Sequence, residues 1–99
     1  MNKEIPLVGG SVNSHQQFDV QLGDNLVTIT LLWKSILEQW SMDIDQEGVR
    51  LVSGAMLEPG CDIIATWQSD LGRLVLVGDE ATLDNLGRSN SLIWIPPND

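Results

Sequence analysis

The chain has 99 residues, which is enough for one hydrophobic core, so we expect a single domain. Asp and Glu total 14 against 5 for Lys and Arg, a formal net charge of -9, and the acids are spread along the chain. This charge argues against general or sequence-specific binding to nucleic acid, which needs clustered basic residues, and against an anionic membrane surface as a partner.

The first 16 residues predict a flexible N-terminal arm. They contain Pro6, the pair Gly9-Gly10 and a Ser/Asn-rich run, with no sustained hydrophobic period. His15 lies in this arm and is therefore not expected to act as a base. The arm lacks the apolar run of a signal peptide, and no stretch reaches the roughly 20 apolar residues that cross a bilayer. We expect synthesis in the cytoplasm and a single folded domain over residues 17–99.

The next part of the chain predicts an antiparallel β-meander. Apolar and polar side chains alternate over residues 18–22, 27–33 and 40–45, and alternate side chains share one face of a strand. Residues 23–25 supply the first turn and residues 34–38 the second. The inward-facing set comprises Phe18, Val20, Leu22, Val27, Ile29, Leu31, Trp33, Trp40, Met42 and Ile44.

A turn at residues 45–48 follows, and we expect Gly48 to take the left-handed conformation there. The pattern then predicts a strand over residues 49–52 that Gly54 ends, and a second turn containing Gly60. Residues 62–67 do not alternate, and their apolar members share one helical face. They predict a helix of about two turns that begins at Asp62, whose carboxylate suits the positive end of the helix dipole.

The last third of the chain predicts two more strands. Residues 73–77, RLVLV, are almost continuously apolar, which favours a central strand buried on both faces or packed against the helix. A polar loop over residues 81–90 leads to a final strand at residues 91–95, which Pro96 ends. We expect structural turn roles for Gly48, Gly60, Gly72 and Gly87.

About six short strands with one short helix define a mainly β fold. Too few helices are present to connect parallel strands, so the sequence predicts a small antiparallel β-barrel or sandwich. Of the two, we favour the barrel, since the element order is also compatible with a small closed barrel.

No residue pattern predicts catalysis or cofactor binding. The chain lacks the common nucleophile, phosphate-loop and metalloprotease motifs, so we expect no enzyme activity, no cofactor and no metal. Cys61 is the only cysteine, which excludes an intrachain disulfide and a Cys-rich zinc site; a small buried hydrophobe is its expected role. Residues 43–48 look like the start of an EF-hand loop, but Gly54 stands where the bidentate acid belongs, which favours a solvated β-turn.

The four tryptophans leave two interpretations open. They could form a stacking platform for bases or sugars, or they could fill the core and place one or two rings at a subunit interface. The second is favoured, because no Lys or Arg cluster accompanies them. Trp94, between Ile93 and Ile95, is the best candidate for an interface ring, and Trp67 is another.

Six short segments, in this order, give the chain a family resemblance: residues 40–48 (WSMDIDQEG), 51–54 (LVSG), 57–64 (LEPGCDII), 71–74 (LGRL), 84–87 (DNLG) and 92–95 (LIWI). Together they resemble the small baseplate plug proteins of contractile-tailed bacteriophages, over residues 18–95. The N-terminal arm lies outside this resemblance. Ile36 and Leu37 depart from it, because a polar turn is expected there; we expect this tip to contact a specific neighbour.

The resemblance implies a structural component of the virion rather than a catalyst. It implies several copies, as a homotrimer, packed at the central hub of the tail baseplate, where they plug or brace the tube end before infection. Its partners would be copies of itself and the baseplate hub and spike proteins. The alternative is a free-standing β-barrel binding module for a peptide or saccharide that uses exposed Trp rings. A hydrolytic enzyme is disfavoured by the lack of a nucleophile and base pair.

Overall fold

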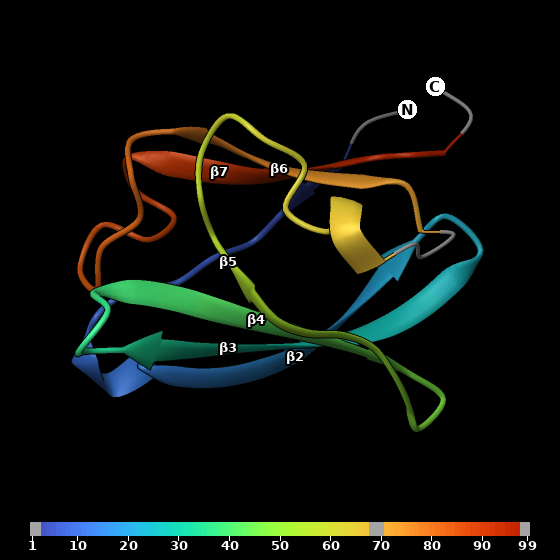
Figure 1. Cartoon of the computed structure of the whole chain (residues 1–99), viewed down its shortest axis with the longest axis horizontal. Coiled ribbons are helices and arrows are strands. Elements are labelled where there is room, and N and C mark those ends of the chain that lie inside the picture. The colour runs from blue at the N-terminus through green and yellow to red at the C-terminus, as the bar shows by residue number, and fades with distance from the viewer. Residues whose placement is uncertain (1–2, 68–70, 98–99) are drawn as a thin grey trace.

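Two antiparallel sheets face each other in the computed structural model, which describes residues 3–67 and 71–97 (Figure 1). One sheet has the order β2 (His15–Leu22), β3 (Asn25–Lys34), β4 (Gln39–Gln46), β5 (Val49–Met56). The other has the order β1 (Lys3–Ile5), β7 (Asn90–Ile95), β6 (Arg73–Gly78). Two 3-10 turns complete the described chain, η1 (Ser11–Asn13) and η2 (Ala65–Trp67). The mainly β antiparallel fold predicted from the sequence is confirmed.

The four-stranded sheet is the predicted meander, and its alternation sets which face is buried. Val27, Ile29 and Leu31 on β3 are fully buried, as are Trp40 and the next two apolar positions along β4. They pack against the inner face of the second sheet, in one continuous core. At the end of the β3–β4 pair, Trp33 and Trp40 lie opposite each other with ring centroids 5.6 Å apart and planes at 62°. The edge-to-face contact closes that end of the sheet.

The preference for a barrel was wrong, because the two sheets do not join into a closed cylinder. No strand pairing links β1 to β2 or β5 to β6 among the described residues. After Met56 the chain does not add a further strand beside β5. It runs along β6 instead, through isolated bridges from Pro59 to Leu76 and from Asp62 to Val75. This path leaves the four-stranded sheet with a separate edge, so the architecture is a sandwich.

The helix predicted over residues 62–67 is also wrong. Asp62 does lie at the start of a turn, but its Oδ1 accepts both the N–H of Ile64 and the N–H of Leu74, each at 3.2 Å. The N–H of Ile63 donates to the carbonyl of Leu74 at 2.8 Å. Backbone groups that would form hydrogen bonds within a helix therefore pair with β6 instead. The segment forms only the short 3-10 turn η2. In residues 3–67 and 71–97, no helix has the length and apolar character to cross a membrane.

Strand β6 differs from the predicted central strand, since it forms one edge of its sheet. Its residues alternate: Leu74 and Leu76 are fully buried, whereas Val77 is 54% exposed. The segment after β5 bridges to Leu76 and Val75 at the outer edge of β6, and Val75 is half-buried. The apolar run therefore does not correspond to burial on both faces of the strand.

The segment predicted to be a flexible arm contains regular structure from Lys3 onward. Glu4 lies opposite Ile93 in the β1–β7 pairing, and Ile5 is buried in the core with 1% of its surface exposed. Further along, the N–H of Gly10 donates to the carbonyl of Leu83 at 2.6 Å. A strand of three residues is too short to show an alternation of apolar and polar side chains. It can be recognised only from its pairing with β7, which is distant in the sequence.

Strand β5 also continues past the predicted stop at Gly54. Ser53 and Gly54 together stand opposite the single residue Asp43, which is a β-bulge. Gly54 has φ +75°, and its N–H donates to Asp43 Oδ1 at 2.7 Å. The glycine therefore re-aims the strand instead of ending it.

The four glycines expected to have structural roles all have positive φ, and at Gly87 the surroundings add a steric demand. A Cβ at Gly87 would lie 2.2 Å from the backbone carbonyl oxygen of Leu7, whereas one at Gly60 would meet no atom within 4 Å. The φ values are nearly equal, +82° and +85°. The two sites differ in crowding and hardly at all in backbone conformation.

We therefore expect Gly60→Ala to lower the free energy of unfolding by about 1–2 kcal/mol, the cost of a left-handed residue with a side chain. Gly87→Ala should lower the free energy of unfolding by about 1–3 kcal/mol more than Gly60→Ala does, because the added methyl group pushes the backbone at Leu7 away. Equilibrium unfolding in urea measures both. Equal losses at the two positions would contradict the close approach of the loop to the N-terminal segment.

Candidate contact surfaces

The acidic turn between β4 and β5 is an ion-paired hairpin. Glu47 and Gly48 form a two-residue turn with positive φ, 51° and 81°. Behind it, Arg50 Nε donates to Asp45 Oδ1 at 2.5 Å, and Arg50 Nη1 lies 3.4 Å from Asp43 Oδ2. The hydrogen bond to Asp45 raises the pKa of Arg50 above its ordinary value. Within the described part of the chain, no three His, Cys, Asp or Glu side chains group as metal ligands.

Two of the four tryptophans are core residues. Trp40 is fully buried, and its indole N–H donates to the carbonyl of Thr82 at 2.9 Å. Trp94 is 6% exposed, and its indole N–H donates to the carbonyl of Leu71 at 2.6 Å. The sequence predicts Trp94 as an interface ring; in the structure this ring is buried in the core and offers little surface to a partner.

Trp33 and Trp67 are only half-buried, but both pack against the core. Each of these two rings therefore presents only part of its surface to a ligand or a partner. Trp67 stays a candidate interface residue by virtue of its partial exposure. Cys61, expected to be buried, is exposed, and its thiol contacts the carbonyl of Glu58 at 3.8 Å.

One end of the sandwich carries exposed apolar side chains. Ile36 is 96% exposed and Leu37 58% in the β3–β4 turn, and Val12 in η1 is 91% exposed. The carbonyl of Ser14 accepts the N–H of Trp33 at 2.8 Å, which fixes η1 beside the turn end of the β3–β4 hairpin. The turn and η1 therefore lie at the same end of the molecule, at the left in Figure 1. We call Val12, Ile36 and Leu37 the apolar tip.

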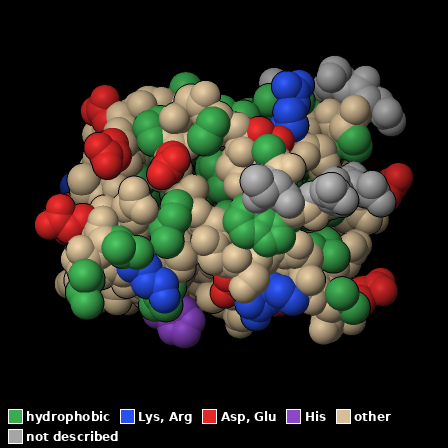
Figure 2. All heavy atoms as spheres, in the orientation of Figure 1, with side chains coloured by type: hydrophobic (Ala, Val, Ile, Leu, Met, Phe, Trp, Pro, Cys, Tyr) green, Lys and Arg blue, Asp and Glu red, His purple; other side chains and the backbone are tan. Residues whose placement is uncertain are grey.

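A hollow of about 570 Å³ adjoins the apolar tip. The β3–β4 hairpin contributes Trp33, Ser35 and Glu38 to it, and residues 80–84 line the opposite side. Three carboxylates border the hollow, those of Glu38, Glu80 and Asp84. Figure 2 shows acidic side chains gathered at this end of the molecule. An acidic rim around an indole ring suits a basic side chain from a partner.

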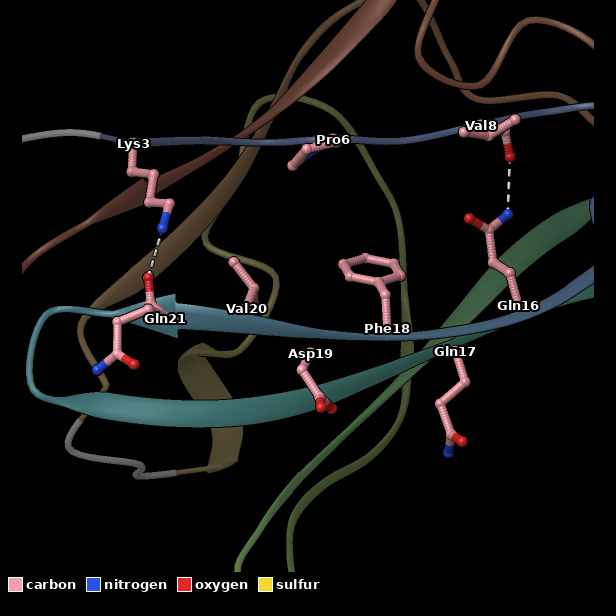
Figure 3. Close-up of a pocket in the computed structure, with 9 residues that line it drawn as sticks. All are labelled: Lys3, Pro6, Val8, Gln16, Gln17, Phe18, Asp19, Val20 and Gln21. Carbon is pink, nitrogen blue, oxygen red and sulfur yellow. Dashed lines mark hydrogen bonds between the residues drawn. The ribbon is translucent and has the colours of Figure 1, made fainter.

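A second groove, of about 550 Å³, lies between the N-terminal segment and β2 (Figure 3). Pro6, Phe18 and Val20 give it an apolar lining. It is bridged at one end by Lys3, whose Nζ donates to the carbonyl of Gln21 at 2.7 Å. At the other end Gln16 Nε2 donates to the carbonyl of Val8 at 2.7 Å.

Sequence reasoning placed Ile36 and Leu37 at an exposed turn, which the structure shows them to occupy, but it missed Val12 and the acidic hollow. The only signal for Val12 is one apolar residue in a polar run. No sequence signal indicates the hollow, because its two sides, residues 33–38 and 80–84, are far apart in the chain.

The fold and these surfaces define a class: a small β-sandwich with an exposed apolar tip and an acidic hollow at one end. Residues 2–97 match the family described as Cyanophage baseplate Pam3 plug gp18, and the chain belongs to this family. The resemblance seen in the sequence is thereby confirmed. Membership supports a structural role in the baseplate and a place in the virion tail, in contact with other baseplate proteins. No curated protein matches the chain.

The burial of Trp94 leads to a stability prediction. Trp94→Phe should lower the free energy of unfolding by about 3 kcal/mol, because it leaves the buried Leu71 carbonyl without its donor and shrinks the ring. Trp33→Phe should cost only about 1 kcal/mol, because this ring is half-buried. Urea unfolding of both variants tests this. A Trp94 variant as stable as the Trp33 variant would argue that the ring is not held between the sheets.

Proposed function

We propose that this protein packs at the central hub of a phage tail baseplate and plugs or braces the end of the tube before infection. Its partners there are the hub and spike proteins. The observation that supports this most is the apolar tip, in which Ile36 has 96% of its surface exposed on a protein of net charge -9. Large apolar side chains grouped at one end of a small domain are characteristic of a contact with another protein.

The apolar tip is well suited to docking because a rigid hairpin carries it. The β3–β4 pairing continues without interruption to Lys34 and Gln39, so only four residues form the turn. The Trp33 and Trp40 rings pack beneath them. A turn held this close to its sheet loses little conformational entropy when a partner covers it.

The acidic hollow supports a partner with exposed basic side chains. A Lys or Arg from that partner would enter between Glu38 and Asp84 while its neighbours cover the tip. Such charge pairing speeds association and orients it, and the apolar contact holds the complex together.

We also propose that the protein acts as a homotrimer. Closure of a threefold ring buries the same two complementary patches on every copy, and a small domain with a limited core gains stability from such burial. Native mass spectrometry of the full chain should give three times the 10.9 kDa of one chain, alone or with the hub protein present. A single-chain mass under both conditions would contradict the trimer.

Substitution of the apolar tip tests the docking role. Ile36→Ser combined with Leu37→Ser should change the free energy of unfolding by no more than about 0.5 kcal/mol per residue, because both side chains are exposed. The same variant should be recovered with assembled baseplates at least about tenfold less than the native protein, as expected for loss of central apolar contacts.

The matched control is Val49→Ser. Val49 is 60% exposed and lies at the β4–β5 turn, at the opposite end of the sandwich (Figure 1). It should be recovered with baseplates at the native level, as judged by mass spectrometry of purified tails. Normal incorporation of the double variant would contradict docking through the tip.

A further inference from the structure

A sandwich has four edge strands, and here they are β2 and β5 in one sheet and β1 and β6 in the other. The outer edge of each strand carries backbone N–H and C=O groups that can pair with another chain. Proteins normally protect such edges with bulges, prolines, short strands or covering segments.

Three of the four edges are protected here. The edge of β6 is covered, since Gly60 and Ile63 donate backbone hydrogen bonds to it. The edge strand β5 is bulged twice, once at Gly54 and once between Val52 and Arg50. The edge strand β1 has only three residues and is followed directly by Pro6.

Within residues 3–67 and 71–97, none of these devices protects the fourth edge, β2. Its eight residues pair with β3 in an unbroken register, and the strand contains no proline and one acidic residue, Asp19. The two-residue turn after Leu22 makes Leu22 and Asn25 a hydrogen-bonded pair. Hydrogen-bonded positions alternate along the strand, so the N–H and C=O of Gln17 and Asp19 point outward.

The hydrogen bonds of β2 agree with this outward orientation of the backbone groups of Gln17 and Asp19. The carbonyl of Gln21, another outward position, accepts the bond from Lys3 Nζ instead of pairing with β3. The backbone hydrogen bonds found outside the sheets, over residues 3–67 and 71–97, include none to Gln17 or Asp19. Two residues in the middle of the strand thus present both backbone groups to a partner.

The apolar groove lies directly beside this free edge. Phe18 and Val20 point into it, toward Pro6, whereas Gln17 and Asp19 point to the opposite side of β2 (Figure 3). A strand added to β2 would place alternate side chains over Phe18 and Val20 and the intervening one beside Asp19. This is the arrangement by which sheet edges bind extended peptides.

We propose that the β2 edge binds an extended segment of a partner protein in which apolar residues alternate with basic ones. The apolar residues fill the groove, and the basic residue pairs with Asp19 across the strands. Charge at the edge favours this occupant over a second copy paired through β2, because β2 carries the acid Asp19 and no Lys or Arg that could pair with it. The inference stands on the free edge and does not depend on a role in the baseplate.

A synthetic peptide of sequence Lys-Val-Lys-Val-Lys-Val-Lys, with blocked termini, serves as the probe. Titrated into the full-length protein, it should shift the NMR signals of residues 17–20 and slow hydrogen exchange at the amides of Gln17 and Asp19. The same peptide with Glu in place of Lys should bind at least about tenfold more weakly, because it loses the charge pairing and meets a protein of like charge.

Two variants separate backbone pairing from side-chain contact. Gln17→Pro removes an N–H that β3 does not use, so the fold should persist while affinity for the Lys peptide falls about tenfold. Gln17→Val loses the same side-chain bond to Thr30 but keeps the N–H, and it should bind as the native protein does. If the proline variant unfolds, the peptide N-methylated at alternate amides applies the same test to the native chain.

Three results would overturn the proposal. The first is absence of binding at millimolar peptide, and the second is equal affinity for the Lys and Glu peptides. The third is protection of the Gln17 and Asp19 amides by protein concentration alone, which would identify a second copy as the occupant.

Discussion

Two buried indole N–H groups hold the irregular half of the chain onto the sheets. Trp40 donates to the carbonyl of Thr82 and Trp94 to the carbonyl of Leu71. Each bond satisfies a loop carbonyl near the core, where an unpaired polar group would cost about 1–3 kcal/mol. The Trp40 bond matters most for function, because Thr82 belongs to the loop that lines the acidic hollow and contacts the N-terminal segment at Leu83. The surface at this end therefore depends on a core residue of β4.

The predictability of each element follows from whether its partners are local. Strands β2 to β4 could be predicted because short turns connect them and alternation alone sets their buried face. The segment at Ile63 could not, because its backbone pairs with Leu74, and the first strand could not, because Ile5 pairs with β7. The predicted barrel failed for the same reason: closure depends on where the chain goes after Met56, and the bridges to β6 leave no local signal.

The contact surfaces divide in the same way. Ile36 and Leu37 could be identified as candidate contact residues because they are apolar at a turn, where polar residues are expected. Burial of Trp94 could not, since an apolar residue between two isoleucines suits a core and an interface equally well. The edge of β2 was also hidden, because a half-buried strand in the sequence gives no sign of which neighbour it lacks.

The charge of the protein and its unprotected edge are best understood together. An open edge on an apolar groove normally invites pairing between identical chains, which leads to aggregation. Here β2 carries one acidic residue, Asp19, and no Lys or Arg, so pairing of two copies through this edge brings like charges together, whereas contacts through other surfaces are not affected. A partner with basic residues experiences attraction on the same surface. Charge at the edge can thus limit pairing through the exposed backbone groups of Gln17 and Asp19, as bulges and covering segments do for β5 and β6. The edge stays available to a partner of opposite charge.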